Sequence, residues 1–187
     1  MPPPRLGRVA RLLHLNGAPG VGKSTLAQRY AAEHPGVLAC DIDRLRCFVG
    51  GWEDDFAGAG AVIRPVAQAM IAAHLAEGRD VVLPQMLADE DERARFRSVA
   101  VDAGHAYVHV LLQAPRGIAA DRLHARPAAD PLHAVVHAEI ERAGGAAAVE
   151  ELADRLERSA ARDPDVLRVD TGGSPTATYE ALVAALG

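Results

Sequence analysis

Eight consecutive residues near the start of the chain have the types and spacing that bind a chain of phosphate groups. They are Gly17, Ala18, Pro19, Gly20, Val21, Gly22, Lys23 and Ser24. Glycines at this spacing let the backbone turn tightly, so that successive N–H groups point at one phosphate. The Lys23 ammonium can then reach the β- and γ-phosphates of ATP, and the Ser24 hydroxyl is a ligand for Mg²⁺. We therefore expect these residues, together with Thr25, to bind ATP and Mg²⁺.

Lys23 is the only lysine in a chain that has 19 arginines. Since arginine replaces lysine everywhere else, this lysine is expected where an arginine cannot do the same work. The pattern G-x-x-x-x-G-K-[ST] is the Walker A motif, or P-loop, and its proper context is a strand before it and a helix after it. An apolar stretch at 9–15 and a helical pattern at 23–34 supply that context. The alternative, a chance glycine-rich turn, leaves this agreement unexplained.

Two aspartates, Asp41 and Asp43, follow a short apolar stretch at 37–40. In an open parallel sheet, ligands bind beyond the carboxyl ends of the strands. We predict that Asp43 is the general base that takes the proton of an acceptor hydroxyl. Asp41 is predicted to hold a Mg²⁺-bound water or the substrate. The alternative is that one of the two only caps the next helix, and the sequence leaves the choice between them open.

Four further residues are candidates for the same site. Arg46 is a candidate substrate contact, because a guanidinium can bind a carboxylate or phosphate with two hydrogen bonds. Gln85 follows the third apolar stretch, where a conventional Walker B strand would end in aspartate, and it is expected to orient a water or the substrate. Metal binding then rests on Ser24, the phosphates, waters and Asp41. Arg122 and Arg126 lie four residues apart on one predicted helix face. The alternative to a role in the site is that they are simply two arginines on the protein surface.

Two histidines, His133 and His137, are spaced like a metal-binding pair on a helix, with Glu139 nearby. No third ligand is evident from the sequence, and the order H-E-x-x-H is missing. We interpret the pair as part of a solvent-exposed helix face.

Apolar stretches and helical patterns alternate along the chain. Strands are expected at 9–15, 37–40, 81–83, 107–112 and 166–169. Helices are expected at 23–34, 61–77, 89–103, 115–124, 132–143, 147–161 and 176–186, with irregular segments at 50–60 and 126–131. The helix at 61–77 is expected to bury a face made of Ile63, Val66, Met70 and Ala73. This alternation predicts an α/β fold with a parallel sheet that helices cover on both faces.

Three motifs resemble those of the nucleotide-kinase-like superfamily of P-loop small-molecule kinases. Besides the P-loop they are the acids at 41–43, as in chloramphenicol and shikimate phosphotransferases, and R-x-x-x-R at 122–126. Asp43 to Arg46 is similar to the D-x-x-R of polynucleotide-kinase-like members, and the segment 82–86 is similar to the tunicamycin-resistance branch. The resemblance implies a three-layer P-loop NTPase sandwich with a five-stranded sheet in the order 2-3-1-4-5. It also implies one domain over 1–187 with a lid around 116–160, where Arg122 stacks on adenine and Arg126 closes over the phosphates as a catalytic residue.

Length and composition limit the classes of function that this chain can have. The chain has 187 residues, a net charge of −5 and two cysteines, so we expect one cytoplasmic domain. Asn16 is the only asparagine, which excludes the guanine-reading N-K-x-D motif. We expect an ATP- and Mg²⁺-dependent phosphotransferase acting on a hydroxyl of an antibiotic, nucleoside-like or sugar-like molecule, with a role in antibiotic resistance as one option. The first alternative is a 5′-hydroxyl polynucleotide kinase, although the acidic charge argues against nucleic-acid binding. The second is a non-catalytic ATP-binding regulator, because the Walker B acid is missing.

No apolar run in the sequence approaches the roughly 18 residues of a membrane span, so we expect no membrane partner. The expected partner is the small-molecule acceptor, and a second copy of the chain in a homodimer is the other one that we consider.

Overall fold

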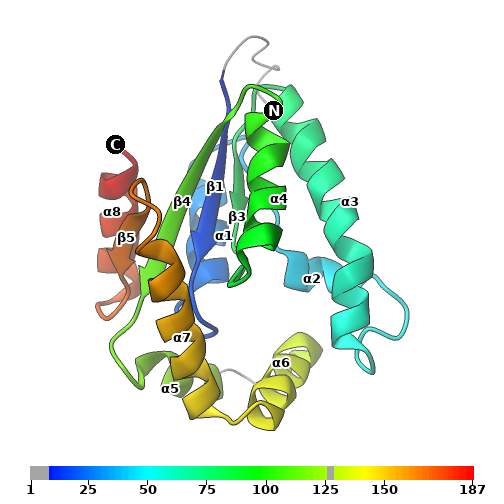
Figure 1. The fold of residues 1–187 in the computed structure, drawn as a ribbon, viewed down its shortest axis with the longest axis vertical. Helices are drawn as coiled ribbons and strands as arrows, with labels where there is room; N and C mark the ends of the chain where they lie inside the picture. The colour runs from blue at the N-terminus through cyan, green and yellow to red at the C-terminus, as the bar shows by residue number, and fades with distance from the viewer. Residues whose placement is uncertain (1–8, 126–128) are drawn as a thin grey trace.

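The computed structural model describes residues 9–125 and 129–187, and within them five strands form one parallel sheet. The strands are β1 (Arg11–Asn16), β2 (Leu38–Ala39), β3 (Val81–Leu83), β4 (Ala106–Gln113) and β5 (Leu167–Asp170). Their order across the sheet is β2-β3-β1-β4-β5, which confirms the predicted order (Figure 1). The central strand β1 pairs with β3 on one side, Leu13 opposite Val82, and with β4 on the other.

Helices cover both faces of the sheet, so the predicted three-layer arrangement is confirmed (Figure 1). In the described ranges they are α1 (Lys23–Glu33), α2 (Ile42–Arg46), α3 (Phe56–Ala76), α4 (Glu90–Val101), α5 (Ile118–His124), α6 (Pro131–Arg142), α7 (Ala146–Ala160) and α8 (Pro175–Leu186). Leu13 and Leu15 point to the face that packs against α1 and α8. Leu12 points to the opposite face, against α3 and α4, because successive strand residues alternate.

Helix α3 differs from its prediction at its start and on its buried face. It begins at Phe56, inside the segment expected to be irregular, because the Asp55 side chain caps it by accepting from Gly58 N at 2.8 Å. The buried row is Ile63, Ala67, Ile71 and Leu75, whereas Val66, Met70 and Ala73 are exposed. The helix is apolar on several sides, so the sequence could not distinguish a row spaced by four residues from one that also uses steps of three.

The same helix is long and apolar enough, by length and composition alone, to cross a membrane. Arg64, Gln68 and His74 interrupt its apolar residues, so the helix does not contain an uninterrupted apolar run of that length. In the structure its row at Ile63, Ala67, Ile71 and Leu75 packs against the sheet and α4. Only 28% of the apolar window is buried, so the other sides of the helix lie at the surface of the described domain.

Two polar side chains lie inside the apolar central strand. His14 is fully buried; its Nε2–H donates to Gln85 O at 2.8 Å, and its Nδ1 lies 2.8 Å from the Tyr107 hydroxyl. Asn16 is also buried: its Oδ1 accepts from the N–H groups of Gly17 and Leu87, and its Nδ2 donates to Leu87 O. These hydrogen bonds satisfy the buried polar groups and connect β1 to the segment after β3.

We expect the buried His14 to make the fold sensitive to acid. Burial, with the nearby His109, lowers its pKa from 6.5 to about 3. As the pH falls, the imidazole of the unfolded chain takes up a proton before that of the folded chain does. The stabilising contribution of neutral His14 is therefore fully present above pH 6.5 and is lost as the pH falls from 6.5 toward 3. Between pH 7 and pH 5 this residue alone should remove about 2 kcal/mol from the free energy of unfolding. Urea unfolding at both pH values measures it, and His14→Gln, which cannot titrate, should show a clearly shallower pH dependence; an unchanged slope would refute the assignment.

Candidate nucleotide and acceptor site

The P-loop connects β1 to α1 at the carboxyl end of the sheet, as the sequence predicts. The structure buries Gly17, Ala18, Gly20 and Val21, half-buries Pro19, Gly22, Lys23 and Ser24, and exposes Thr25. Gly22 has a left-handed conformation (φ 95°) at the N-cap of α1, and no side chain caps that helix. The first N–H groups of α1 are therefore not used by a capping side chain, and a helix start of this kind binds phosphate.

Lys23 extends across this loop. Its Nζ donates to Gly17 O at 2.8 Å and to Ala18 O at 2.9 Å. The ammonium is thus held at the mouth of the loop by two carbonyl groups that precede the helix. A nucleotide phosphate that enters the loop would meet a positive charge already in position.

Gly20 marks the closest contact between the P-loop and the rest of the domain. A Cβ placed on this residue would lie 1.9 Å from Ala119 O, a backbone atom in the first turn of α5, and φ is +89°. Only glycine fits there, and the loop therefore packs directly on α5.

We expect Gly20→Ala to weaken ATP binding by more than about tenfold, because the loop or α5 must move to admit the new methyl group. Isothermal titration with ATP measures the change. Gly50→Ala is the matched control, since a Cβ there meets nothing within 4 Å and φ lies outside the left-handed range. Equal affinities of the two variants would contradict the packing role of Gly20.

Asp41 takes the capping role that the sequence left open. Its Oδ1 accepts from Asp43 N at 3.1 Å and from Arg44 N at 3.3 Å, and this starts the short helix α2. Both hydrogen bonds use the same carboxylate oxygen. The cap places Asp43 in the first turn of α2, beyond the end of β2.

Asp43 combines partial burial with access. Its side chain is 37% exposed, and its Oδ1 lies 3.5 Å from Arg46 Nε. Burial raises the pKa of this carboxyl above its ordinary value and the Asp41 charge adds to the rise, while Arg46, Lys23 and a hydrogen bond from Gln85 oppose it. A raised pKa makes the carboxylate a better proton acceptor.

The side chains of Gln85 and Arg46 both lie next to the Asp43 carboxylate. Gln85 is 6% exposed, and among the described residues its Oε1 has no hydrogen-bond partner, so it can accept from a ligand hydroxyl or a water. Arg46 is buried; its guanidinium stacks on the Phe56 ring at 4.0 Å and donates to Phe56 O. The structure therefore places Arg46 between Asp43 and the start of α3, where it positions the carboxylate.

The predicted arginine pair is only partly described. Arg122 lies on α5, and its Nη2 donates to Gly173 O at 3.4 Å, in the loop between β5 and α8. This contact joins Arg122, which the resemblance assigns to adenine, to the loop that follows β5. Arg126 lies outside the described residues.

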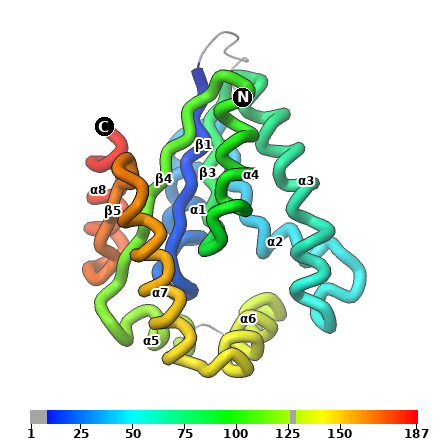
Figure 2. The backbone as a smooth tube through the Cα atoms, in the orientation of Figure 1, coloured from blue at the N-terminus to red at the C-terminus, as the bar shows by residue number. Residues whose placement is uncertain are grey.

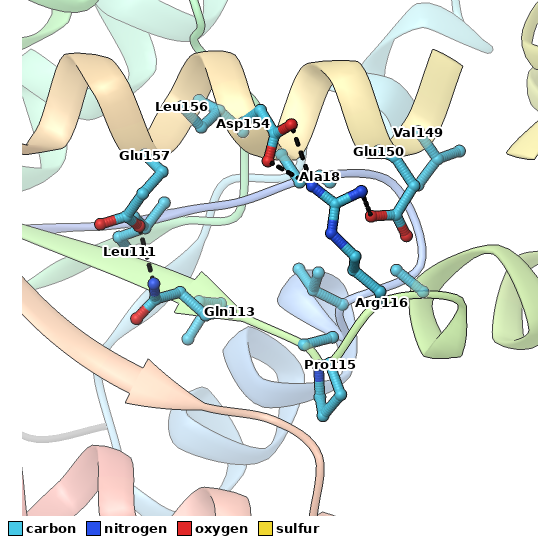
Figure 3. Close-up of a pocket in the computed structure, with 15 residues that line it drawn as sticks. Ala18, Leu111, Gln113, Pro115, Arg116, Val149, Glu150, Asp154, Leu156 and Glu157 are labelled. Atoms are coloured by element: carbon cyan, nitrogen blue, oxygen red, sulfur yellow. Dashed lines mark hydrogen bonds and ion pairs between the residues drawn. The ribbon is translucent and has the colours of Figure 1, made fainter. Parts of the chain in front are cut away.

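A small cavity next to the P-loop contains residues that the sequence did not single out (Figure 3). Its volume is about 150 Å³, and Arg116 there pairs with Glu150 at 3.6 Å and Asp154 at 3.2 Å. Glu150 also accepts from Gly117 N at 2.8 Å, directly before α5. The cavity is too small for a nucleotide. Its ion pairs join α7 to the start of α5, a long-range contact without a local sequence signal.

Comparison with known proteins agrees with this geometry. The family model AAA_33, described as an AAA domain, matches residues 12–161. No curated protein sequence matches the chain. A gluconokinase from Sinorhizobium meliloti 1021 has a similar structure, with a TM-score of 0.65 and 17% identity over 96% of this chain and 93% of that one. The tunicamycin resistance protein of Deinococcus radiodurans has a TM-score of 0.57 and 20% identity, with 95% of each chain covered. The matched family model spans most of the chain, and the chain therefore belongs to the AAA_33 family of P-loop kinases.

Proposed function

We propose that the protein transfers the γ-phosphate of ATP, with Mg²⁺, to a hydroxyl of a small molecule in the cytoplasm. The observation that carries the proposal is that the P-loop, which would bind the ATP phosphates, and Asp43, which would bind the acceptor hydroxyl, lie at the same end of the sheet. Lys23 follows the carboxyl end of β1 and Asp43 follows the carboxyl end of β2 in the same parallel sheet, and the Lys23 charge acts to lower the pKa of the Asp43 carboxyl. A phosphate held by the P-loop and a hydroxyl held by Asp43 would then face each other, which is the geometry that in-line transfer needs.

The residues present suit a magnesium ion. The Ser24 hydroxyl lies in the first turn of α1, and the capping hydrogen bonds of Asp41 use only Oδ1, which leaves Oδ2 for a metal-bound water. Oxygen donors of this kind fit Mg²⁺. When bound, the ion neutralises charge on the β- and γ-phosphates, while Asp43 accepts the hydroxyl proton and Gln85 orients the acceptor.

The arginines on the acceptor side favour an uncharged acceptor. Arg44 pairs with Asp130 at 2.6 Å, Arg64 pairs with Glu92, and Arg46 pairs with Asp43. Each of these cations therefore has an acidic partner, and an anionic substrate would have to displace it. This pairing, with the net charge of −5, argues against the polynucleotide-kinase alternative. A carboxylate poised as a base argues against a non-catalytic regulator.

The α5–α7 segment serves as the lid in this proposal. Helices α5 and α6 lie at the end of the domain where the strands reach their carboxyl ends, and α7 runs from that end back along the sheet (Figure 2). Asp130 at the start of α6 reaches Arg44 on α2, so the lid contacts the acceptor side of the site.

The test is ATP consumption by the full chain with a panel of acceptors, followed by mass spectrometry of each product for one added phosphate. Tunicamycin and gluconate come first because of the names of the two similar structures, with nucleosides, other antibiotics and a 5′-hydroxyl oligonucleotide beside them. Gluconate is an anion, so the comparison of these two also tests the preference for an uncharged acceptor. Phosphate on a small-molecule hydroxyl supports the proposal. Phosphate on the oligonucleotide supports the first alternative, and ATP binding without transfer to any acceptor supports the second. Lys23→Ala is the control for contaminating kinases.

A further inference from the structure

Three side chains that can bind a metal meet between two helices of the lid segment, apart from the candidate site. They are His124 from α5 and His137 and Glu141 from α6, and their ligand atoms all lie within 4.8 Å of one another. His124 Nε2 is 3.1 Å from Glu141 Oε1, and His137 Nε2 is 3.8 Å from the same oxygen. The two imidazole rings meet edge to face with centroids 5.0 Å apart.

The orientation of His124 is fixed by its other nitrogen. His124 Nδ1 lies 2.7 Å from Ala120 O. A carbonyl oxygen can only accept, so Nδ1 carries the hydrogen and donates it. Nε2 then faces Glu141 Oε1 at 3.1 Å, where its protonated form donates a hydrogen bond, and a metal ion between the two would take the place of that proton. A backbone carbonyl behind the ring is the usual support for a metal-binding histidine.

The distances match the size of a bound transition metal. With bonds of about 2.0–2.1 Å to nitrogen and oxygen, tetrahedral ligand atoms lie about 3.3 Å apart. The separations of 3.1 and 3.8 Å between each Nε2 and Glu141 Oε1 are close to this value. His137 and Glu141 are four residues apart on one helix face, so the backbone already places them side by side.

The cluster is also accessible to a cation. The side chains of His124, His137 and Glu141 are 46%, 42% and 47% exposed. Two imidazoles and one carboxylate form a donor set that binds Zn²⁺ with a water in the fourth position. Mg²⁺ prefers oxygen donors and is not expected to compete.

We propose that His124, His137 and Glu141 bind one divalent transition-metal ion of the Zn²⁺ type, which joins α5 to α6. This differs from the sequence interpretation, in which His137 formed a pair with His133 on an exposed face. In the structure the partners of His137 are His124 and Glu141, whereas His133 lies 3.8 Å from Asp130. The missing third ligand comes from another helix and has no local signal.

The site would couple two parts of the lid. His124 is two residues after Arg122, whose guanidinium contacts Gly173 on the nucleotide side. Asp130, the N-cap of α6, pairs with Arg44 on the acceptor side. A metal between the helices would therefore hold these two contacts in a fixed relation.

The experiment uses full-length, tag-free, nucleotide-free protein that has been stripped with a chelator, at about pH 8, where unperturbed imidazoles are neutral, in the presence of excess Mg²⁺. Zn²⁺ is titrated calorimetrically and Co²⁺ is followed by its visible spectrum. We expect one equivalent to bind, and His124→Gln, His137→Gln and Glu141→Gln each to weaken binding by more than about tenfold. Zn²⁺ should raise the Tm of the wild type but not of these variants.

His133→Gln is the matched control, because it removes a histidine one turn from His137 and outside the cluster. Its Zn²⁺ affinity should equal that of the wild type. Circular dichroism and Tm in chelator establish that every variant is folded, so a lost signal reports binding. The proposal is overturned if the wild type binds no stoichiometric Zn²⁺, if the three cluster variants bind as tightly as the wild type, or if His133→Gln loses as much affinity as they do.

Discussion

Replacing Lys23 with alanine is expected to reduce phosphoryl transfer at least about 10²–10³-fold, to the limit of detection in most assays, and to weaken ATP binding. Removing one pre-positioned group that stabilises developing charge costs this much in other enzymes, and Lys23 is the only lysine in the chain. Lys23 is the only basic residue among residues 17–24, so no second cation of the P-loop can replace it. Steady-state kinetics and ATP titration measure the two effects.

Lys23→Arg should fail as well, although it keeps the charge. The ammonium is held by two carbonyl groups at 2.8 and 2.9 Å, in a space built for a compact group. A planar guanidinium is larger and directs its donors in a fixed fork. A near-normal rate in either Lys23 variant would contradict the kinase proposal.

The second large effect is expected at Asp43. Asp43→Asn keeps the shape of the side chain but removes the proton acceptor, and general-base help is worth about 10²–10⁴ in rate. Phosphoryl transfer has a loose transition state, so the lower end applies and kcat should fall about a hundredfold. ATP affinity should not change, because the P-loop is not altered. The cap of α2 also stays in place, and a lower Tm would report the loss of the charged partner of the buried Arg46.

Asp41→Asn is the matched control for that experiment. Asparagine caps a helix as well as aspartate does, so α2 should stay formed. If Asp41 acts through a metal-bound water, this variant should need more Mg²⁺ and recover partly when Mg²⁺ is raised. Exchanged phenotypes would reverse the two roles, and full activity in both variants would exclude either aspartate as the base.

The pH profile gives an independent readout of Asp43. Burial raises the pKa of this carboxyl above the ordinary value of 3.8. Activity should therefore fall as the pH decreases through this raised pKa, and the acid limb should disappear in Asp43→Asn. An acid limb of unchanged position in that variant would assign the titration to another group.

The sequence predicted the sheet because its signals are local and continuous. β3 is buried on both faces and apolar throughout, and the leucines of β1 are interrupted only by His14. The same holds for the P-loop, where a fixed spacing of glycines and one lysine carries the chemistry. Helix α3 was harder, because apolar residues on several sides left its buried face undetermined and the capping role of Asp55 was not recognised.

The site could be predicted only in part, because its geometry depends on contacts between distant segments. The sequence identified Asp41 and Asp43, but the choice of a capping residue depends on where α2 begins. Arg46 was expected to face the substrate, and the structure packs it on Phe56. The cluster at His124 and Glu141 joins residues 17 positions apart, and no periodic pattern indicates such a contact.

The hydrogen bonds of Asn16 limit where substitutions can change the preference for an acceptor in this fold. Its side chain bonds to both the first P-loop residue and the segment that carries Gln85. The phosphate cradle and the rear wall of the acceptor site therefore form one mechanical unit, and a substitution that shifts one disturbs the other. Substitutions that change the acceptor are therefore easier to accommodate outside this unit, for example in the turn between α2 and α3 or at the start of α6. The sequence can vary there while nucleotide binding is preserved.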